Sequence, residues 1–501
     1  MGEKYQALVA RLSEIRNVDR ARAILSWDQQ VNMPRGGAKA RAAQLSTLSR
    51  IGHDMLISDE TRHLLQDAEK ETEDAAYDSV EGSMIRVTKR DVHQATCVPT
   101  QLVADITEAE ALGHQVWAEA RANNNFAAFE PALQRILDLK RQEADFLGFV
   151  EHPYDAFLDQ YEPGMTASRV KRLFDAHKRE LVELVVAVSA HSDRANDAVV
   201  RQSYPIDKQR AFGLKMVSNY GYDFERGRQD EAVHPFCITF AQGDVRITTR
   251  FTENYLNPAL FGTMHEAGHA MYEQGVAPEL EGTPLSRGTS LGVHESQSRL
   301  WENVVGRSRN FWSWAYPQLQ DTFPDQLKAV DLETFYRSIN RIAPSYIRVE
   351  ADEATYNLHI MVRFELEMAL VTGALAVHDL PKAWNERFES YLGIVPPTDK
   401  EGVLQDIHWS SGLIGYFPTY AVGNMLAAQY YRQALAAHPT IPDEIGQGKF
   451  DTLREWMRIN IYQHGRKFTA DELTQRITGE PVECGYFVDY LKAKYTDIYG
   501  L

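Results

Sequence analysis

Apolar residues recur at every third or fourth position along most of the chain, which is the spacing of a helix with one buried face. Residues 166–190 show it most clearly, because apolar side chains keep that spacing from Val170 to Val188 and Thr166 stands where an N-cap is expected. The same spacing predicts further helices at 2–30, 100–123, 128–147, 291–310, 353–376 and 451–464.

No linker or internal repeat separates these segments, so the sequence predicts one large, mainly helical domain over residues 1–501. Within it we expect two lobes, an N-terminal helical lobe over roughly residues 1–230 and a second portion over roughly residues 231–501.

One segment departs from the helical spacing. Residues 234–240 and 244–250 each alternate between polar and apolar side chains, and residues 242–243 between them can form a turn. Val245 and Ile247 then share one face of the second strand. This pattern predicts a β-hairpin whose edge could pair with an extended peptide, although a purely structural hairpin fits the pattern equally well.

Charge and cysteine usage narrow the class of protein. The chain has 53 basic and 70 acidic residues and a net charge of −17, which argues against a nucleic-acid partner. Cys97, Cys237 and Cys484 are far apart and odd in number, so neither a disulfide framework nor a cysteine-ligated zinc site is expected. The first residues lack the apolar stretch of a secretory signal, and no apolar run is long enough to span a membrane. The sequence therefore predicts a cytoplasmic protein without a membrane partner.

The strongest candidate chemistry is the sequence His-Glu-Ala-Gly-His at 265–269. At four-residue spacing on a helix, the imidazoles of His265 and His269 project from one face and can bind one metal ion. Glu266 adjoins the first histidine and can reach a water bound to that ion. The motif predicts a zinc hydrolase.

The surroundings of this motif have the signals of a helix. Asn257 is the expected cap, Pro258 the first helical residue and Gly275 the residue at which the helix stops. Gly268 lowers the helix propensity in the middle of this segment, and the sequence alone shows no reason for it.

A third ligand decides whether the histidine pair is a metal site. Glu295 lies 30 residues after His265 (295 − 265), beyond a connection that contains glycine and proline, and Glu302 is its rival in the same helical segment. The alternative is that both glutamates are surface carboxylates. Two histidines and one carboxylate leave the fourth zinc position open for water, which is typical of a catalytic site. Glu266 would then take the proton of that water and pass it to the leaving amine.

At this point the chain resembles a known family, the Taq-type metallocarboxypeptidases. Elements of the form HPF, DxRxT, HExxH, HES/GQ, IRxxAD and GxxQDxHW follow one another in order, at 234–236, 244–248, 265–269, 294–297, 347–352 and 402–409. Residues 26–29 with the Met-Pro pair at 33–34 also look like the family's N-terminal region. The resemblance therefore covers nearly the whole chain.

The resemblance implies a mainly α, cupped, two-lobed fold with a deep active-site groove and a small hairpin or sheet beside the metal helix. It implies zinc, replaceable by cobalt, with Glu295 as the third ligand beside the two histidines. It further implies a homodimer that removes single residues from free peptide C-termini with broad preference and acts poorly before a C-terminal proline.

Residues that would contact substrate come mainly from the later motifs. An exopeptidase must bind a free carboxylate, for which arginine is suited, and the resemblance assigns this to Arg348. The alternative for Arg348 is a structural ion pair with Glu350 or Asp352. His408 is a candidate for substrate binding or oxyanion support, and Gln405 for hydrogen bonds to the peptide backbone.

Other candidates rest on weaker signals. Tyr416 and Tyr420 are candidate oxyanion donors, because tyrosine often has that role. His234, Asp244 and Arg246 come from the HPF and DxRxT elements, and we expect them to line the groove or to surround the metal ligands. Glu302, where it is not a ligand, is expected to orient a ligand histidine.

Two other functions compete with a carboxypeptidase. A zinc endo-oligopeptidase would share the metal site but would not need a free carboxylate on its substrate. An inactive, metal-stabilised scaffold that binds peptides would be expected to have lost Glu266 or a ligand, and the sequence keeps them all.

Overall fold

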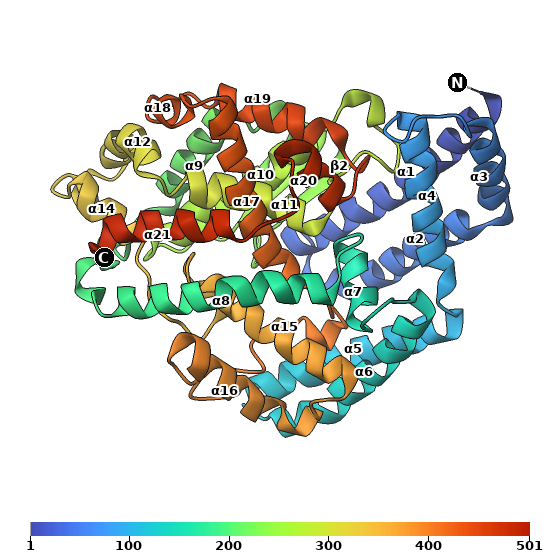
Figure 1. The fold of residues 1–501 in the computed structure, drawn as a ribbon, viewed down its shortest axis with the longest axis horizontal. Helices are drawn as coiled ribbons and strands as arrows, with labels where there is room; N and C mark the ends of the chain where they lie inside the picture. The colour runs from blue at the N-terminus through green and yellow to red at the C-terminus, as the bar shows by residue number, and fades with distance from the viewer. Residues whose placement is uncertain (1) are drawn as a thin grey trace. The chain divides into compact units, whose positions relative to one another are not determined.

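Helices dominate the computed structural model, which describes residues 2–501, and a single three-stranded sheet accompanies them (Figure 1). The predicted mainly α fold with a small sheet is therefore confirmed. No helix among the described residues is long and apolar enough to cross a membrane.

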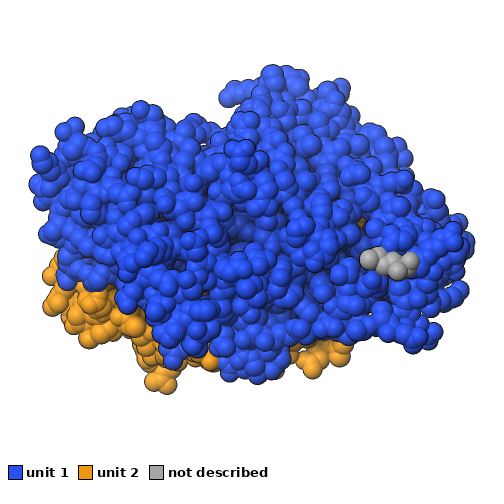
Figure 2. Space-filling model, turned by 90° about the horizontal axis from the view of Figure 1, so that it is seen from above, with its two compact units in different colours: residues 1–96, 197–339, 430–481 blue, residues 97–196, 340–429, 482–501 orange. Residues whose placement is uncertain are grey.

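The described chain divides into two compact units, each assembled from three stretches of sequence (Figure 2). The first unit contains residues 1–96, 197–339 and 430–481, and the second contains residues 97–196, 340–429 and 482–501. The expected lobes with a boundary near residue 230 stay a prediction.

The first unit holds the sheet and most of the helices. Its helices are α1 (Glu3–Val31), α2 (Ala38–Ile57), α3 (Asp59–Glu71), α4 (Val80–Cys97, all but its last residue), α9 (Ile206–Tyr220), α10 (Leu256–Gln274), α11 (Leu291–Arg299), α12 (Arg309–Thr322), α13 (Pro324–Leu327), α14 (Leu332–Ile339), α18 (Ile441–Ile445), α19 (Asp451–Asn460) and α20 (Ala470–Thr478).

The second unit consists of helices and the segments that connect them, and it contains no strand among its residues, all of which the structure describes. Its helices are α5 (Thr100–Ala122), α6 (Phe126–Leu147), α7 (Tyr154–Tyr161), α8 (Ala167–Ser189), α15 (Tyr356–Thr372), α16 (Leu380–Leu392) and α21 (Gly485–Tyr499). The residues of α17 (Pro418–Ala437) are divided between the two units at residue 430.

The predicted hairpin is present. Strand β2 (Cys237–Ala241) pairs antiparallel with β3 (Asp244–Thr249), and Val245 and Ile247 are fully buried on one face of β3. A third strand, β1 (Gln229–Glu231), pairs in parallel with β3, so the order is β1-β3-β2 and β2 lies at an edge. The sequence did not predict β1, because three residues are too few to show an alternation.

Local signals predicted several helices closely. Helix α8 begins after Thr166, whose Oγ accepts a hydrogen bond from the backbone N–H of Arg169 at 3.4 Å, as an N-cap does. The single helix predicted at 291–310 is wrong beyond residue 305. Helix α11 continues as a π-helical segment (Leu300–Val305), and α12 begins afresh after Ser308.

The start of α10 also differs from the prediction. The helix begins at Leu256, so Asn257 lies inside it and is not its cap, and Pro258 is its third residue. Proline is tolerated there because the first-turn N–H groups have no partner within the helix. Helix α10 is buried nearly all round and packs against β3, α9 and α11, which places it in the core of the first unit.

Candidate functional site

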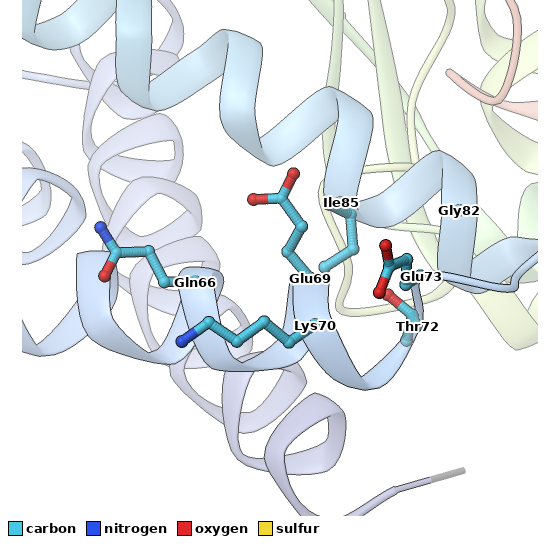
Figure 3. A pocket seen from close by; sticks show the side chains of 7 residues that line it. All are labelled: Gln66, Glu69, Lys70, Thr72, Glu73, Gly82 and Ile85. Atoms are coloured by element: carbon cyan, nitrogen blue, oxygen red, sulfur yellow. The ribbon is translucent and has the colours of Figure 1, made fainter.

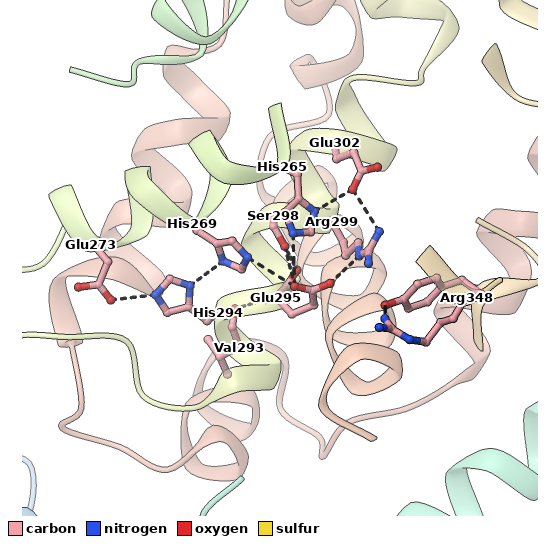
Figure 4. A network of polar contacts seen from close by, with 12 residues as sticks. His265, His269, Glu273, Val293, His294, Glu295, Ser298, Arg299, Glu302 and Arg348 are labelled. Atoms are coloured by element: carbon pink, nitrogen blue, oxygen red, sulfur yellow. Dashed lines mark hydrogen bonds and ion pairs between the residues drawn. The ribbon is translucent and has the colours of Figure 1, made fainter. Parts of the chain in front are cut away.

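Helices α10 and α11 bring three predicted ligand side chains together (Figure 4). The Nε2 atoms of His265 and His269 lie 3.6 and 3.5 Å from Oε2 of Glu295. One ligand atom from each residue lies within 4.8 Å of the others. Ligands about 2.1 Å from one ion at tetrahedral angles are roughly 3.4 Å apart, so the three side chains fit a zinc-sized ion.

Glu302 occupies a different position from Glu295. Its Oε2 lies 2.9 Å from Nδ1 of His265, on the side of the ring away from Nε2. Arg299 donates to Oε1 of Glu295 at 2.7 Å and to Oε2 of Glu302 at 3.1 Å, so it neutralises charge on both carboxylates. The geometry therefore favours Glu295 as a ligand and Glu302 as the partner that orients His265.

The titration of these groups follows from burial and neighbouring charge. Burial lowers the pKa of His269 to about 4, which keeps its imidazole neutral. Burial opposes the charge of His265 as well, but the carboxylates of Glu295 and Glu302 outweigh it and raise the pKa of His265. Burial raises the pKa of the Glu266 carboxyl to about 7, against the opposing effect of His265.

Gly268 has a packing reason that the sequence could not show. A Cβ atom at this position would lie 2.5 Å from the carbonyl oxygen of Gln297 and 2.7 Å from Cα of Ser298. Real Cβ atoms do not approach other atoms so closely, so a glycine lets α10 and α11 come near enough to assemble the three side chains.

Two functional candidates were missed by the sequence analysis. His294 lies with its Nδ1 2.6 Å from Nδ1 of His269, and its Nε2 is 2.8 Å from Oε1 of Glu273. Two signals could have pointed to them: Glu273 follows His269 by one helical turn, and His294 directly precedes Glu295.

Arg348 belongs to the second unit and forms an ion pair there, though with neither expected partner. Its Nε and Nη2 each lie 3.0 Å from Oδ1 of Asp406, and its Nη1 donates to the hydroxyl of Tyr356 at 3.0 Å. Asp352 instead accepts hydrogen bonds from backbone N–H groups, including that of Ala343. The Asp406 carboxylate outweighs burial and raises the pKa of Arg348.

Four other predicted residues of the second unit lie near Arg348, and three of them have rings. The rings of His408, Tyr416 and Tyr420 lie 5.4–6.4 Å apart by their centroids, and the Arg348 guanidinium lies 5.1 Å from the Tyr420 ring. Burial lowers the pKa of His408 to about 4.

Gln405 is the fourth predicted residue that lies near Arg348. Its Oε1 accepts a hydrogen bond from the backbone N–H of Arg348 at 2.8 Å, and its Nε2 donates to the carbonyl groups of Tyr346, Glu401 and Gly402. The amide thus holds the local backbone in place.

The predicted residues of the HPF and DxRxT elements lie in the first unit. His234 is exposed, whereas Arg246 binds the carboxylate of Asp244 through two hydrogen bonds of 2.8 Å. The Arg246 guanidinium also lies over the Trp27 ring, 4.4 Å from its centroid. Asp244 and Arg246 thus have structural partners in each other.

A pocket of about 510 Å³ lies elsewhere in the first unit, where α3 and α4 meet (Figure 3). It is lined by five polar side chains, one glycine and one buried isoleucine: Gln66, Glu69, Lys70, Thr72, Glu73, Gly82 and Ile85. It contains no histidine or cysteine, and its residues include none of the predicted site residues.

The chain is similar to metallocarboxypeptidases over nearly its whole length. A family model described as carboxypeptidase Taq (M32) metallopeptidase matches residues 7–495. Thermostable carboxypeptidase 1 of Thermus thermophilus is 40% identical, with 99% of each chain covered, and carboxypeptidase 1 of Bacillus subtilis is 37% identical, with 98% of this chain and 97% of the relative covered.

Solved structures of carboxypeptidases are similar to this chain in fold as well as in sequence. The crystal structure of the M32 carboxypeptidase from Deinococcus radiodurans R1 superposes with a TM-score of 0.97 at 40% identity, covering 100% of both chains. Metallocarboxypeptidase 1 of Trypanosoma cruzi superposes with a TM-score of 0.94 at 34% identity, covering 98% of this chain and 99% of that one. These similarities confirm the resemblance inferred from the motifs.

Proposed function

Because the chain belongs to the carboxypeptidase Taq (M32) metallopeptidase family and is a metallocarboxypeptidase, we propose that it removes single residues from free peptide C-termini with broad preference. We further propose that the metal is zinc, held by His265, His269 and Glu295. The observation that carries this assignment is the convergence of their three ligand atoms within 4.8 Å of one another.

The donor set supports zinc among the common metals. Two imidazole nitrogens and one carboxylate oxygen are ligands that zinc accepts, and three protein ligands leave a fourth position open, as catalytic zinc sites do. When bound, such a metal supplies a Lewis acid that polarises a carbonyl group and lowers the pKa of water. Cobalt is expected to replace it, because it accepts the same donors.

Glu266 is the proposed general base. It adjoins His265 on α10, and its side chain is buried beside the ligand group. In the proposed mechanism, Glu266 takes a proton from the water that attacks the scissile carbonyl and passes that proton to the leaving amine.

Substrate recognition is proposed to depend on the residues gathered in the second unit. Arg348 is the candidate for binding the free carboxylate, since its planar guanidinium can donate two hydrogen bonds to one carboxylate. His408, Tyr416 and Tyr420 are candidates for stabilising the oxyanion, and Gln405 is proposed to support the backbone of Arg348.

One digest tests the proposed function. A single peptide is supplied as the free acid and as the C-terminal amide, with and without a chelator, and the products are followed by mass spectrometry. We expect stepwise loss of C-terminal residues from the free acid only, abolished by the chelator and restored by zinc or cobalt. A peptide ending in proline should be a poor substrate.

Two other outcomes would replace the proposal. Internal cleavage of both peptide forms would indicate a zinc endo-oligopeptidase with the same metal chemistry. Absence of cleavage in a protein that contains zinc would indicate a peptide-binding scaffold. The resemblance supports a homodimer, which sedimentation velocity would test. The net charge of −17 and the absence of a long apolar run support a cytoplasmic protein without a nucleic-acid or membrane partner.

A further inference from the structure

The second ligand histidine starts a chain of hydrogen bonds that leads away from the metal site. Nδ1 of His269 lies 2.6 Å from Nδ1 of His294, and Nε2 of His294 lies 2.8 Å from Oε1 of Glu273 (Figure 4). All three residues belong to α10 or α11, and Glu273 is 5% exposed.

The acceptor at the far end determines where each proton lies. An ionised carboxylate can only accept hydrogen bonds, so Nε2 of His294 donates to Glu273. A His294 ring whose one proton is on Nε2 has its lone pair at Nδ1, and Nδ1 of His269 is then the donor between the two rings. This tautomer leaves Nε2 of His269 unprotonated, and Nε2 is the atom that lies 3.5 Å from Oε2 of Glu295.

The opposite arrangement would block the site. If Nδ1 of His294 carried a proton, Nδ1 of His269 would have to accept it, and a neutral His269 would then hold its own proton on Nε2. A protonated Nε2 cannot bind a metal, since the ligand is the neutral nitrogen with a free lone pair.

The surroundings hold the chain in this geometry. Oε1 of Glu273 also accepts a hydrogen bond from the backbone N–H of Gly288 at 3.0 Å. A Cβ atom at Gly288 would lie 2.6 Å from Cδ2 of His294 and 2.9 Å from Cε1 of Tyr272, so the glycine lets the loop pack directly against the His294 ring. Nη2 of Arg16 donates to the carbonyl oxygen of Ser286 at 3.1 Å and anchors the same loop.

We propose that His294 and Glu273 are positioning residues that set the tautomer and ring orientation of His269 for metal binding. The inference rests on the proposed metal site. Nδ1 of His265 contacts the carboxylate of Glu302 directly, whereas Nδ1 of His269 contacts His294 and is linked to the carboxylate of Glu273 through that ring. The two ligand histidines are thus supported by separate groups.

A matched pair of variants separates positioning from packing. In His294→Asn, a side-chain oxygen can replace Nδ1 as the acceptor for His269, because both atoms are bonded to Cγ. In His294→Leu, the volume is similar but the acceptor is lost. The zinc dissociation constant of each purified protein is measured by competition with a chromophoric chelator, and the melting temperature is measured with the metal removed.

We expect His294→Leu to bind zinc about 10- to 100-fold more weakly than the wild type, the usual effect of removing the partner of a ligand histidine. His294→Asn should stay within a few fold of the wild type. Equal zinc affinity of His294→Leu and the wild type would overturn the inference, and so would equal weakening in both variants.

A measurement on the wild type keeps the inference testable if His294→Leu does not fold. In the zinc-loaded protein labelled with ¹⁵N-histidine, long-range ¹H–¹⁵N spectra report which ring nitrogen carries the proton. We expect His294, assigned by the signal that is lost in the His294→Asn spectrum, to be protonated at Nε2 only. A proton on Nδ1 of His294 would overturn the inference.

Failure of this inference can be told apart from failure of the proposed function. A wild type that binds zinc tightly but is insensitive to His294→Leu would refute only the positioning role. A wild type that binds neither zinc nor cobalt would refute the metal site itself, and the positioning role with it.

Discussion

At the scale of single residues, Glu295 uses its two carboxylate oxygens for different tasks. Oε1 accepts a hydrogen bond from Arg299 at 2.7 Å, whereas Oε2 accepts one from the Ser298 hydroxyl at 3.2 Å and faces both histidine Nε2 atoms. Glu295→Ala should therefore abolish tight zinc binding, whereas Glu302→Ala should weaken it by about 10- to 100-fold, because Glu302 contacts the proposed ligand His265 and is not itself a proposed ligand. Elemental analysis after dialysis against buffered zinc measures both. Full zinc occupancy in Glu295→Ala would show that the third ligand is another group.

Glu266 offers a sharper test of the chemistry. Glu266→Gln keeps the size of the side chain and leaves all three proposed ligands in place, but it removes the proton acceptor. We expect kcat to fall by about 10²- to 10⁴-fold, the usual contribution of a general base, with zinc content unchanged. Steady-state kinetics on a free-acid peptide and elemental analysis check the two parts. A variant with normal turnover would rule out the proposed mechanism.

A substitution of Arg348 tests recognition of the substrate carboxylate separately from catalysis. Asp406 keeps its partner Arg363, whose Nε lies 2.7 Å from Oδ2, so Arg348→Ala should still fold. Loss of charged hydrogen bonds to substrate is expected to lower kcat/KM for free-acid peptides by about 10- to 100-fold, from a contribution of about 1.5–3 kcal/mol. Arg348→Lys serves as the control that keeps the charge. If any residual cleavage of amidated peptides fell by the same factor, the carboxylate role would be excluded.

At the scale of elements, the close approach of α10 to α11 assembles the site, and two glycines of α10 allow a matched test. Gly268→Ala would place a Cβ 2.5 Å from the Gln297 carbonyl oxygen, so we expect a loss of about 1–3 kcal/mol in the free energy of unfolding, together with weaker zinc binding. Gly262→Ala meets no atom within 4 Å and should gain about 0.5–1 kcal/mol from helix propensity. Denaturant titration of the metal-free proteins measures both changes. Equal changes in the free energy of unfolding for the two variants would mean that the contact between α10 and α11 does not restrict the size of the side chain at position 268.

Elements with a complete local signal could be predicted from the sequence. Helix α8 has both its cap and its apolar spacing within one stretch, and the β2–β3 hairpin has its turn between two alternating segments. Strand β1 could not be predicted because its three residues are too few to show an alternation, and the break between α11 and α12 because it depends partly on packing with a distant helix. Gly306, just after the π-helical segment, shows this second case: a Cβ there would lie 2.8 Å from Sδ of Met264 on α10, besides 2.6 and 2.7 Å from the carbonyl oxygens of Glu302 and Trp301 in the preceding turn.

The residues of the candidate site also differ in how far the sequence could predict them. Helical spacing was enough to predict the histidine pair, whereas the prediction of Glu295 depended on the order of the motifs around it. The roles of His294 and Glu273 depend on how two helices meet in space, which no single stretch of sequence encodes. For the same reason, Asp406 as the partner of Arg348 became visible only in the folded chain.

At the scale of the whole molecule, the proposed ligands all come from α10 and α11 in the first unit, so metal removal should affect the two units unequally. A ligand present at about 1,000 times its dissociation constant stabilises the form that binds it by about 4 kcal/mol. A chain with two units need not unfold in one step, so local hydrogen exchange is a better measure here than a single melting temperature.

We therefore expect a chelator to speed amide exchange in peptides from α10 and α11 by up to about 10³-fold, the factor that corresponds to about 4 kcal/mol. Peptides from α6 and α8 in the second unit, which contribute no ligand, should exchange at unchanged rates and serve as the internal control. Mass spectrometry of the exchanged, digested protein measures both sets, and added zinc should reverse the change. Equal acceleration in both units would show that the metal stabilises the whole chain, and no acceleration in α10 and α11 would contradict the assigned ligands.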